Sequence, residues 1–297
     1  MKKLVFLKFK SPFRNGGLNE SNETLGTIHS DTIFSAVSYC AFRLFEDKAK
    51  DFVKTFRVSS LMFAFRENEK YDYLVFKPLS FNTLKIKKDF KKAKKLNYIP
   101  VSRINDIIKD PEILTDESFQ KHNNPVEIQR IASNSLDRIT NNSNLYFLES
   151  VFVKPDYIPY IVADYDSEYE NIFISSIKLL GDSGLGADST RGFGLFEPEF
   201  HDVPDYFKAE GRFNLLLSLY YPSKEEITKI SDNCIYKVIK RRGHKKDTVE
   251  TKPTINYLSE GSVLDFKPAI RENMFLDSIG VYLQTSPLVM SFGGDEI

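Results

Sequence analysis

Apolar side chains and lysines alternate near the start of the chain, which predicts a strand with one buried face. Three apolar side chains within residues 4–10 share one face, and Lys8 and Lys10 lie on the other. A helix is expected next, because Ser30 is a good N-cap and Asp31 suits the positive end of a helix. Its buried face would consist of apolar residues at helical spacing: Ile33, Val37, Cys40, Ala41 and Leu44.

Further elements alternate between strand and helix patterns. Residues 58–66 and 71–77 predict a hairpin, residues 145–153 and 193–200 predict strands, and residues 169–180 predict a helix ending at Gly181. Residues 78–146 lack sustained periodicity and are interpreted as an insertion with some helix. The order β-α-β-β-α-β is that of a ferredoxin-like module, which RNA-recognition domains share.

A second series of segments with strand-like or helix-like patterns follows Pro204. Residues 213–221 alternate like a strand, and Ser223 with Glu226 forms a capping-box pattern at a helix start. Two strand-like runs flank a basic turn at Gly243, but a clear second helix is missing. The chain is therefore expected to be α+β, with two tandem ferredoxin-like modules. The first would span residues 1–203, with the insertion at about 78–146, and the second, degraded module residues 204–297.

Composition places the chain among globular proteins, with 41% hydrophobic and 28% charged residues and no run long enough for a membrane span. The two cysteines show no CxxC spacing, so neither a zinc site nor a disulfide framework is indicated, which fits a reducing cytoplasm. Net charge is zero, yet residues 85–95 carry seven lysines, and the turn at 240–246 includes Arg241, Arg242, Lys245 and Lys246. Both blocks suit a polyanion, and both also suit a solvated surface.

A glycine-rich segment at 181–194 carries the strongest chemical signal. It holds five of the fourteen glycines. Such a loop can present concave rows of backbone N–H groups to an anion. Its candidate binding residues are Gly184, Gly186, Ala187, Asp188, Ser189, Thr190, Arg191, Gly192 and Phe193. The pattern fits neither a P-loop, which needs Gly-Lys-Ser/Thr, nor a dinucleotide fingerprint, which needs strand, loop and helix in that order. The alternative is a tight connection between a helix and a strand.

The sequence GLGADSTRGFGLFE, together with the upstream segment HSDTIF, resembles the RAMP superfamily of CRISPR proteins. Within it, the chain is similar to the fourth-subunit family of type III-A (Csm) effector complexes. The resemblance implies a cytoplasmic, structural RNA-binding subunit that holds the 5′ repeat-derived tag of the guide RNA. It also implies partners: the large polymerase-like subunit and a neighbouring RAMP backbone subunit, with no membrane contact.

Several site residues follow from the resemblance. The glycine loop would contact tag phosphates, with His29, Ser30 and Asp31 close by, and the insertion would project a thumb-like hairpin. Arg130 and Arg138 occupy positions where the family has basic residues. Lys8, Lys10 and the turn at 240–246 join the candidate RNA-binding set on charge alone, not through the resemblance.

Catalysis is the main alternative, because a related RAMP branch cuts precursor CRISPR RNA without metal. His29 is the only histidine beside a recognised motif and is a candidate general base. No second histidine accompanies it, and no metal-ligand spacing or cofactor motif is present, so we expect neither metal nor cofactor. A third hypothesis is an enzyme that binds a small phosphorylated ligand. We interpret the chain as non-catalytic.

Overall fold

The structure is a computed structural model. It describes residues 1–16, 24–67, 70–83, 86, 89–121, 123–137, 139, 142–208, 210–243 and 250–293. None of the described helices is both long and apolar enough to cross a membrane.

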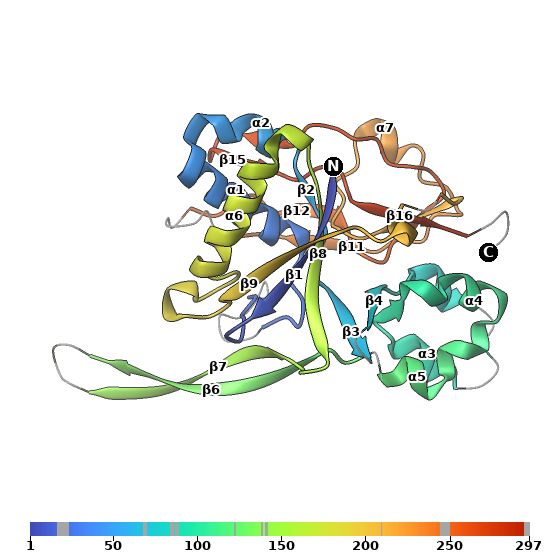
Figure 1. Ribbon diagram of the computed structural model, residues 1–297, viewed down its shortest axis with the longest axis horizontal. Coiled ribbons are helices and arrows are strands. Elements are labelled where there is room, and N and C mark those ends of the chain that lie inside the picture. Colours follow the sequence, from blue (N-terminus) through green and yellow to red (C-terminus); the bar gives the residue numbers. More distant parts are fainter. Residues whose placement is uncertain are drawn as a thin grey trace.

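A large antiparallel sheet forms the centre of the molecule (Figure 1). Its strand order is β5-β4-β3-β8-β1-β9, and β2 also pairs with β8. The strands are β1 Lys2–Phe9, β2 Arg57–Val58, β3 Met62–Glu67, β4 Lys70–Phe76, β5 Tyr98–Pro100, β8 Tyr157–Asp164 and β9 Phe196–Asp202. The sub-order β9-β1-β8-β3 places the last strand of the module beside the first, followed by the third and second. This is the ferredoxin-like arrangement that the sequence predicts.

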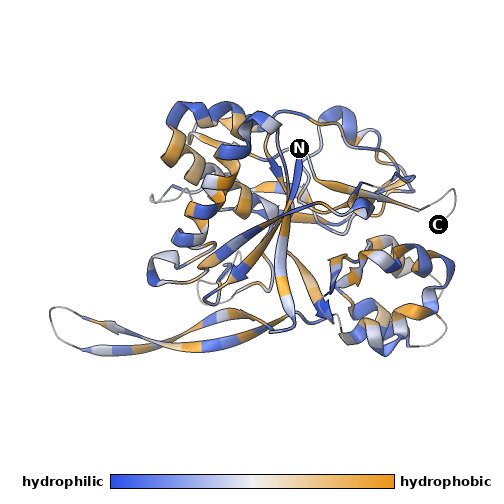
Figure 2. Cartoon of the chain, viewed as in Figure 1, coloured by the Kyte–Doolittle hydropathy of each residue, from blue (hydrophilic) through white to orange (hydrophobic). Residues whose placement is uncertain are grey.

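Two helices cover one face of this sheet, α1 (Ser30–Phe45) and α6 (Glu170–Ser183), and α2 (Ala49–Thr55) packs against α1. The core between these layers includes Val5, Leu7, Phe34, Phe173 and Ile177, all at most 1% exposed. In Figure 2, apolar positions concentrate on the central strands and on the helices that face them. The periodicity of both helices therefore predicts most of their buried faces, but Leu44, expected on the buried face of α1, is 45% exposed near the end of the helix.

Two helix ends differ from the prediction. His29, rather than Ser30, occupies the N-cap of α1. Helix α6 continues through Gly181 to Ser183, and Gly184 is its C-cap, at φ 87°. Gly181 stays inside the helix and lies so close to β9 that a methyl group there would overlap the carbonyl oxygen of Phe196. This glycine permits close packing of helix and strand instead of ending the helix.

The prediction missed β8, the strand between β1 and β3. Six of its eight residues are buried, so the alternation of apolar and polar positions is lost, and Pro159 interrupts its sequence signal. The hairpin expected around residues 58–77 is confirmed as β3 and β4. Strand β4, however, is not one of the four ferredoxin-like strands β9, β1, β8 and β3. The strand expected at 145–153 belongs to β7, outside this sheet.

The insertion between β4 and β8 forms two separate bodies. The first contains β5 and the short helices α3 (Phe90–Lys95), α4 (Ile104–Lys109) and α5 (Glu117–Lys121), which we call the helical insertion. The second is a two-stranded hairpin of β6 (Val126–Leu136) and β7 (Ser143–Val153), which projects away from the sheet as an arm (Figure 1). This arm has the shape of the expected thumb-like hairpin.

The elements of the second part of the chain are β10 Phe213–Leu216, α7 Lys224–Ile227, β11 Val238–Arg241, β12 Ile255–Leu258, β13 Val263–Leu264, β14 Met274–Leu276, β15 Val281–Leu283 and β16 Val289–Phe292. In this part, β10, β13 and β16 pack on the other face of the main sheet, whereas β15 contacts α1. Strands β13, β10 and β16 form one small sheet, and β11 and β12 form a hairpin around the basic turn, with its second strand later in the chain than the expected residues 248–254. The capping box of Ser223 and Glu226 at α7 is confirmed. The division of the chain near residue 203 stays a prediction.

Candidate nucleic-acid interface

The loop between α6 and β9 is a tightly folded glycine segment. Gly184, Gly186, Gly192 and Gly194 all have positive φ angles, between 72° and 105°. This backbone region favours glycine, because other residues pay a steric cost there. At Gly186, a methyl group would also overlap the carbonyl oxygen of Arg14, whereas at Gly192 it would meet nothing within 4 Å. The glycines are therefore needed for the shape of the loop, and Gly192 is needed only for its φ angle.

Hydrogen bonds to neighbouring segments hold this loop in place. The amide of Ala187 donates to the carbonyl of Arg14 (2.8 Å), and that of Gly194 donates to Pro12 (2.9 Å). Two backbone amides that were predicted to bind phosphate already donate hydrogen bonds within the protein. The amide of Gly184 donates to the carbonyl of Leu180 (2.8 Å), and that of Gly192 donates to the carbonyl of Ser189 (3.0 Å).

Several amides without an acceptor in the described part of the chain lie in the short 3-10 turn of the loop and at its N-cap. Those of Asp188, Ser189 and Thr190 donate to no acceptor among the described residues. The 3-10 turn thus adds backbone donors to that of Gly186, which likewise donates to no acceptor among the described residues, as candidates for an anion.

A buried arginine that sequence reasoning missed fastens the loop. The side chain of Arg14 is 5% exposed and forms an ion pair with Asp188. Its Nε donates to the carbonyl oxygen of Glu149, on β7, at 2.7 Å. Arg14 therefore joins the end of β1, the glycine loop and the base of the arm. Asp188, a predicted RNA-binding residue, instead neutralises this guanidinium. No local motif marks Arg14, because both partners are remote in sequence.

Arg191 lies where the glycine loop meets the arm. Its Nη2 donates to Ser133 Oγ of β6 at 3.1 Å, and its guanidinium carbon lies 5.9 Å from the ring centre of Tyr146 on β7. Its side chain is still 40% exposed. On the arm, Arg130 is 75% exposed and lies 3.6 Å from Glu149. The structure thus brings these two candidate arginines to one region. Arg138, Lys245 and Lys246 lie outside the described residues.

Residues 29–31, the start of the motif HSDTIF, lie where the first part of the chain meets the second part. Ser30 is 1% exposed, and its hydroxyl accepts a hydrogen bond from the amide of Leu219 at 3.0 Å. His29 Nδ1 is 2.9 Å from Glu260 Oε1. Burial makes the Ser30 hydroxyl unavailable to a phosphate in this conformation. The conspicuous motif HSDTIF therefore joins the two parts through Ser30 and His29.

Asp31 continues this junction at the edge of a pocket. Its carboxylate accepts from Arg241 Nε at 3.0 Å and from Nη2 at 3.2 Å. This bidentate pair fixes the β11–β12 hairpin against the first turn of α1. Asp31 therefore orients a cation at the candidate interface.

The pocket has a volume of about 610 Å³ and lies between the glycine loop, α1 and the β11–β12 hairpin. Gly186 and Ala187 line one side, and Arg241, Arg242 and Lys252 line another. Its polar lining also includes residues that sequence reasoning missed: Asn15, Thr32, Ser35, Lys252 and Tyr257. Among the described residues, the lining has three cationic side chains and one carboxylate, that of Asp31, so the pocket suits an anion.

The three cations of this pocket differ in how firmly they are held. Lys252 Nζ donates to Ser35 Oγ at 2.7 Å, and burial lowers the pKa of this lysine. Arg241 is paired with Asp31. Arg242 is exposed, and its Nη2 donates to Thr251 Oγ1 at 3.3 Å. Arg242 therefore has the guanidinium that is most available to a ligand.

The remaining candidates divide between surface and sheet positions. Ala187 and Thr190 are exposed, and Ser189 and Phe193 are half-buried. Lys8 forms an ion pair with Glu199, and Lys10 lies 3.2 Å from Glu197. Each of these two lysines thus faces a glutamate of β9.

The sheet face itself is closed to RNA bases at its centre. RNA-recognition domains stack bases on aromatic side chains of the central strands. Here Phe6 on β1 and Tyr160 on β8 are 0% exposed, and they share a core with Phe213 and Leu215 of the second part of the chain. The second part covers the surface that a single such domain would use. The centre of this sheet face is therefore not open to RNA bases, which leaves the glycine loop, the arm and the pocket as the candidate surfaces.

Comparisons with known proteins agree with this fold. The model of the RAMP superfamily matches residues 6–197, and that of the CRISPR Csm4 C-terminal domain matches residues 209–271. Two curated relatives are named CRISPR system Cms protein Csm4. The protein from Thermococcus onnurineus is 27% identical over 168 residues, covering 55% of this chain and 53% of the relative. The protein from Methanocaldococcus jannaschii is 26% identical over 330 residues, covering 88% and 85%. The match thus spans about half the length of the first relative.

Two solved structures share the architecture over nearly the whole chain. The Csm3–Csm4 subcomplex of a type III-A CRISPR-Cas interference complex matches with a TM-score of 0.68 and 21% identity, covering 98% of this chain and 99% of that chain. A Csm1–Csm4 cassette in complex with cA4 matches with a TM-score of 0.60 and 18% identity, covering 100% of both chains. With the superfamily model covering well over half of its residues, the chain belongs to the RAMP superfamily.

Proposed function

We propose that the chain is a non-catalytic structural subunit of a type III-A CRISPR interference complex and holds the 5′ repeat-derived tag of the guide RNA. The observation that carries this proposal is the pocket between the glycine loop and the β11–β12 hairpin. Arg241, Arg242 and Lys252 line this pocket together with Gly186 and Ala187 of the loop. Such an arrangement suits one or two phosphates of a strand that continues along the loop towards Arg191 and the arm.

Partners follow from the same assignment. The solved relatives are complexes of Csm4 with Csm3 and with Csm1. We infer that this chain likewise contacts a neighbouring RAMP backbone subunit and the large polymerase-like subunit.

A non-catalytic role is supported by the position of His29. Its Nδ1 is bonded to Glu260, and its side chain is only 15% exposed. The Glu260 carboxylate also accepts from Ser60 and is itself 5% exposed. The imidazole is thus held at the junction of the two parts, where it meets Glu260 and Ser60 instead of an open RNA surface. A general base must reach the hydroxyl that it deprotonates.

Arg242→Ala should weaken binding of tag RNA by about fivefold, which is the loss of one charge-assisted phosphate contact. The slope of log K against log salt should become shallower by about 0.7, the value for one phosphate of a single strand. Fluorescence anisotropy with a labelled tag oligonucleotide over a series of salt concentrations measures both quantities.

Lys224→Ala is the matched control, since Lys224 is an exposed cation on α7, away from the pocket. This variant should keep both the affinity and the salt slope of the parent chain. Equal losses in the two variants would show a diffuse charge effect and would contradict the assigned pocket.

The alternative function, metal-independent cleavage of precursor CRISPR RNA, is tested separately. The purified chain should leave repeat RNA intact in the presence of EDTA. Cleavage that disappears in His29→Ala but persists in Lys224→Ala would replace the structural role with an enzymatic one.

A further inference from the structure

Tyr257, on β12, lines the pocket from the interior of the molecule. The residue is only 3% exposed, and its hydroxyl forms no hydrogen bond with any other described residue. Tyr165 also has a hydroxyl without a partner among the described residues, but that atom is sealed from solvent. The hydroxyl of Tyr257 is not sealed in this way, so it is a free polar group at the floor of the pocket.

This hydroxyl keeps its proton and lies near the charges of the pocket. Burial raises the pKa of Tyr257, and the Asp31 carboxylate raises this pKa further, whereas the Arg241 guanidinium lowers it. A phenol with a raised pKa is protonated at neutral pH and can donate a hydrogen bond. Tyr257 is therefore a neutral donor near the ion pair of Asp31 and Arg241.

Two acceptors of the pocket are already taken, which favours a phosphate over a base as the ligand. The Asp31 carboxylate accepts from two nitrogens of Arg241, at 3.0 and 3.2 Å. The side-chain amide of Gln284 is bonded through both of its ends to the backbone of Val58, at 2.9 and 3.0 Å. The edge of a base presents donors as well as acceptors, whereas a phosphate diester presents acceptors alone. The hydroxyl of Tyr257 therefore suits a phosphate oxygen.

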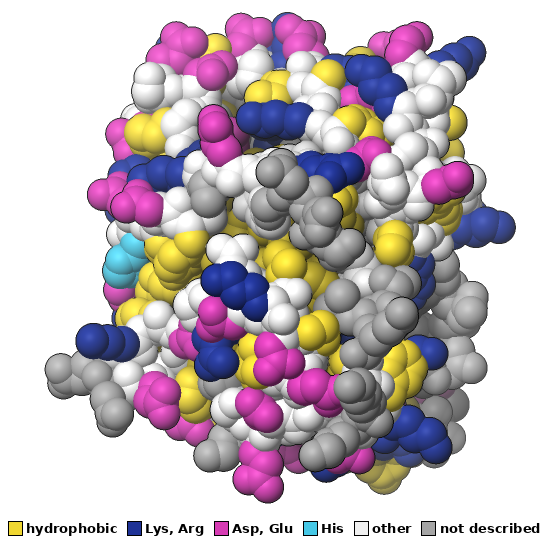
Figure 3. Space-filling view, turned by 90° about the vertical axis from the view of Figure 1, so that its right-hand side faces the viewer, with side chains coloured by type: hydrophobic (Ala, Val, Ile, Leu, Met, Phe, Trp, Pro, Cys, Tyr) yellow, Lys and Arg dark blue, Asp and Glu magenta, His cyan; other side chains and the backbone are white. Residues whose placement is uncertain are grey.

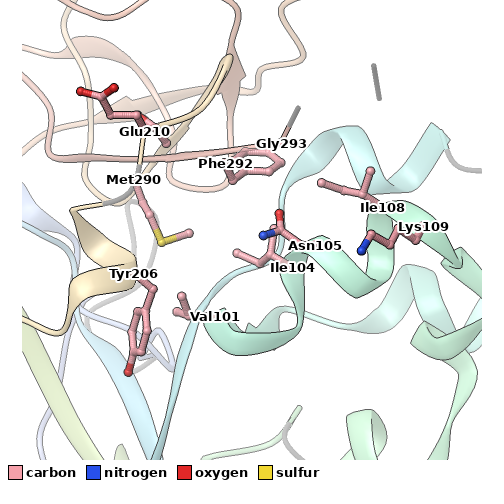
Figure 4. A pocket seen from close by; sticks show the side chains of 11 residues that line it. Val101, Ile104, Asn105, Ile108, Lys109, Tyr206, Glu210, Met290, Phe292 and Gly293 are labelled. Carbon is pink, nitrogen blue, oxygen red and sulfur yellow. The ribbon is translucent and has the colours of Figure 1, made fainter. Parts of the chain in front are cut away.

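A second hollow of the molecule lacks this chemistry. It lies between the helical insertion and the second part of the chain, with a volume of about 380 Å³. Figure 4 shows the apolar side chains of Ile104, Met290 and Phe292 beside it, and Figure 3 shows this side of the molecule, with hydrophobic side chains across its middle. Among the described residues, its charged lining consists of Lys109 and Glu210, whose charges cancel. The excess of cations that a phosphate needs is thus found at the pocket beside the glycine loop.

We propose that the hydroxyl of Tyr257 donates a hydrogen bond to one phosphate of the guide RNA at the floor of the pocket, while Arg242 binds a second phosphate at the rim. This inference rests on the proposed function, since it divides the same pocket between two phosphates. The volume of about 610 Å³ lies within the range of pockets that enclose a whole small ligand, about 300–1,000 Å³. Arg242 is exposed and Tyr257 is buried, so the two side chains bind at different depths.

Tyr257→Phe should lower the affinity for tag RNA by about tenfold, the loss of one hydrogen bond to a charged acceptor. The slope of log K against log salt should stay as in the parent chain, because a neutral hydroxyl releases no counterion, whereas Arg242→Ala should make that slope shallower. The Tm should stay equal or rise, because phenylalanine keeps the ring and removes a hydroxyl that has no partner in the described part of the chain. Fluorescence anisotropy over a series of salt concentrations and differential scanning fluorimetry measure these quantities.

Tyr221→Phe is the matched control, because it removes the same atom from a neighbouring ring. Tyr221 is half-buried, and its ring centre lies 6.1 Å from that of Tyr257, but it is not among the described residues that line the pocket. This variant should keep both the affinity and the salt slope of the parent chain.

A series of tag RNAs, each with one methylphosphonate linkage, then locates the contact. At one linkage the difference between Tyr257→Phe and the parent chain should vanish, because the RNA has already lost the acceptor of that hydrogen bond. If Tyr257→Phe keeps full affinity while Arg242→Ala loses it, the contact is overturned and the proposed function stands. A lower Tm, or a difference that persists at every linkage, would make the hydroxyl a structural group and would also overturn the inference. If the parent chain itself does not bind tag RNA, the proposed function fails, and the contact fails with it.

Discussion

Arg14→Met should lower the free energy of unfolding by about 3 kcal/mol, the usual cost of breaking a buried ion pair by removing one partner. Methionine retains much of the apolar stem, so the loss reports the guanidinium rather than a cavity. Asp188 would lose its buried cation and keep only the exposed Arg191, 3.8 Å away, and the carbonyl of Glu149 would lose a donor. Chemical denaturation followed by circular dichroism gives the change in stability.

Arg14→Met should also lower the affinity for tag RNA by at least about tenfold, although Arg14 itself is buried. Arg14 sets the position of the glycine loop relative to the arm. An RNA strand that contacts both the loop and the arm depends on that relative position. Arg191→Met is the matched comparison, because the Arg191 side chain is 40% exposed and should cost less than about 1 kcal/mol of stability. If the two variants lose equal stability, Arg14 has no special structural role.

Gly186→Ala should be more damaging than its size suggests, with a loss of about 3 kcal/mol or more. Two costs add at this position: the φ angle of +105° disfavours a side chain, and the new methyl group would overlap the carbonyl of Arg14. Relief of that overlap moves Ala187, whose amide bonds to the same carbonyl. The loop, and with it one wall of the pocket, would shift. Differential scanning fluorimetry and tag-RNA anisotropy report the two consequences.

Gly192→Ala separates these two costs. Its φ angle is +86°, but a methyl group there meets nothing within 4 Å, so only the backbone strain of about 1 kcal/mol is expected. RNA affinity should change little. A Gly192→Ala loss as large as that of Gly186→Ala would show that φ strain alone, rather than contact with Arg14, sets the glycine requirement.

Local patterns predicted much of the fold. The periodicity of α1 and α6, the hairpin of β3 and β4 and the capping box at Ser223 all depend on neighbours within a few residues. The ferredoxin-like order followed from them, and the structure confirms it. What failed was β8, because a strand buried on both faces loses the alternation that marks a half-buried strand.

The site was predictable only in outline, since its specific contacts join remote segments. Glycines with positive φ leave a signal in the sequence, and the loop was located from it. Asp31 and Arg241, by contrast, are 210 residues apart, and Arg14 and Asp188 are 174 apart. Nothing in the local sequence distinguishes an arginine that will face RNA from one that will fasten the fold. For the same reason, the motif around Ser30 suggested ligand contact where the structure shows packing between the two parts of the chain.

The coverage of the main sheet by the second part of the chain has a consequence for how this protein can be divided. Leu4, Phe6, Met62 and Tyr160 lie in one core with Val263, Met290 and other residues from the C-terminal third. A fragment that ends near residue 203 would expose this apolar layer to water and would tend to aggregate. The two stretches that match separate family models share this core, so we expect them to depend on each other for stability, and truncation is a poor route to assigning their roles. Point substitutions that leave this layer intact are the sound way to dissect the molecule.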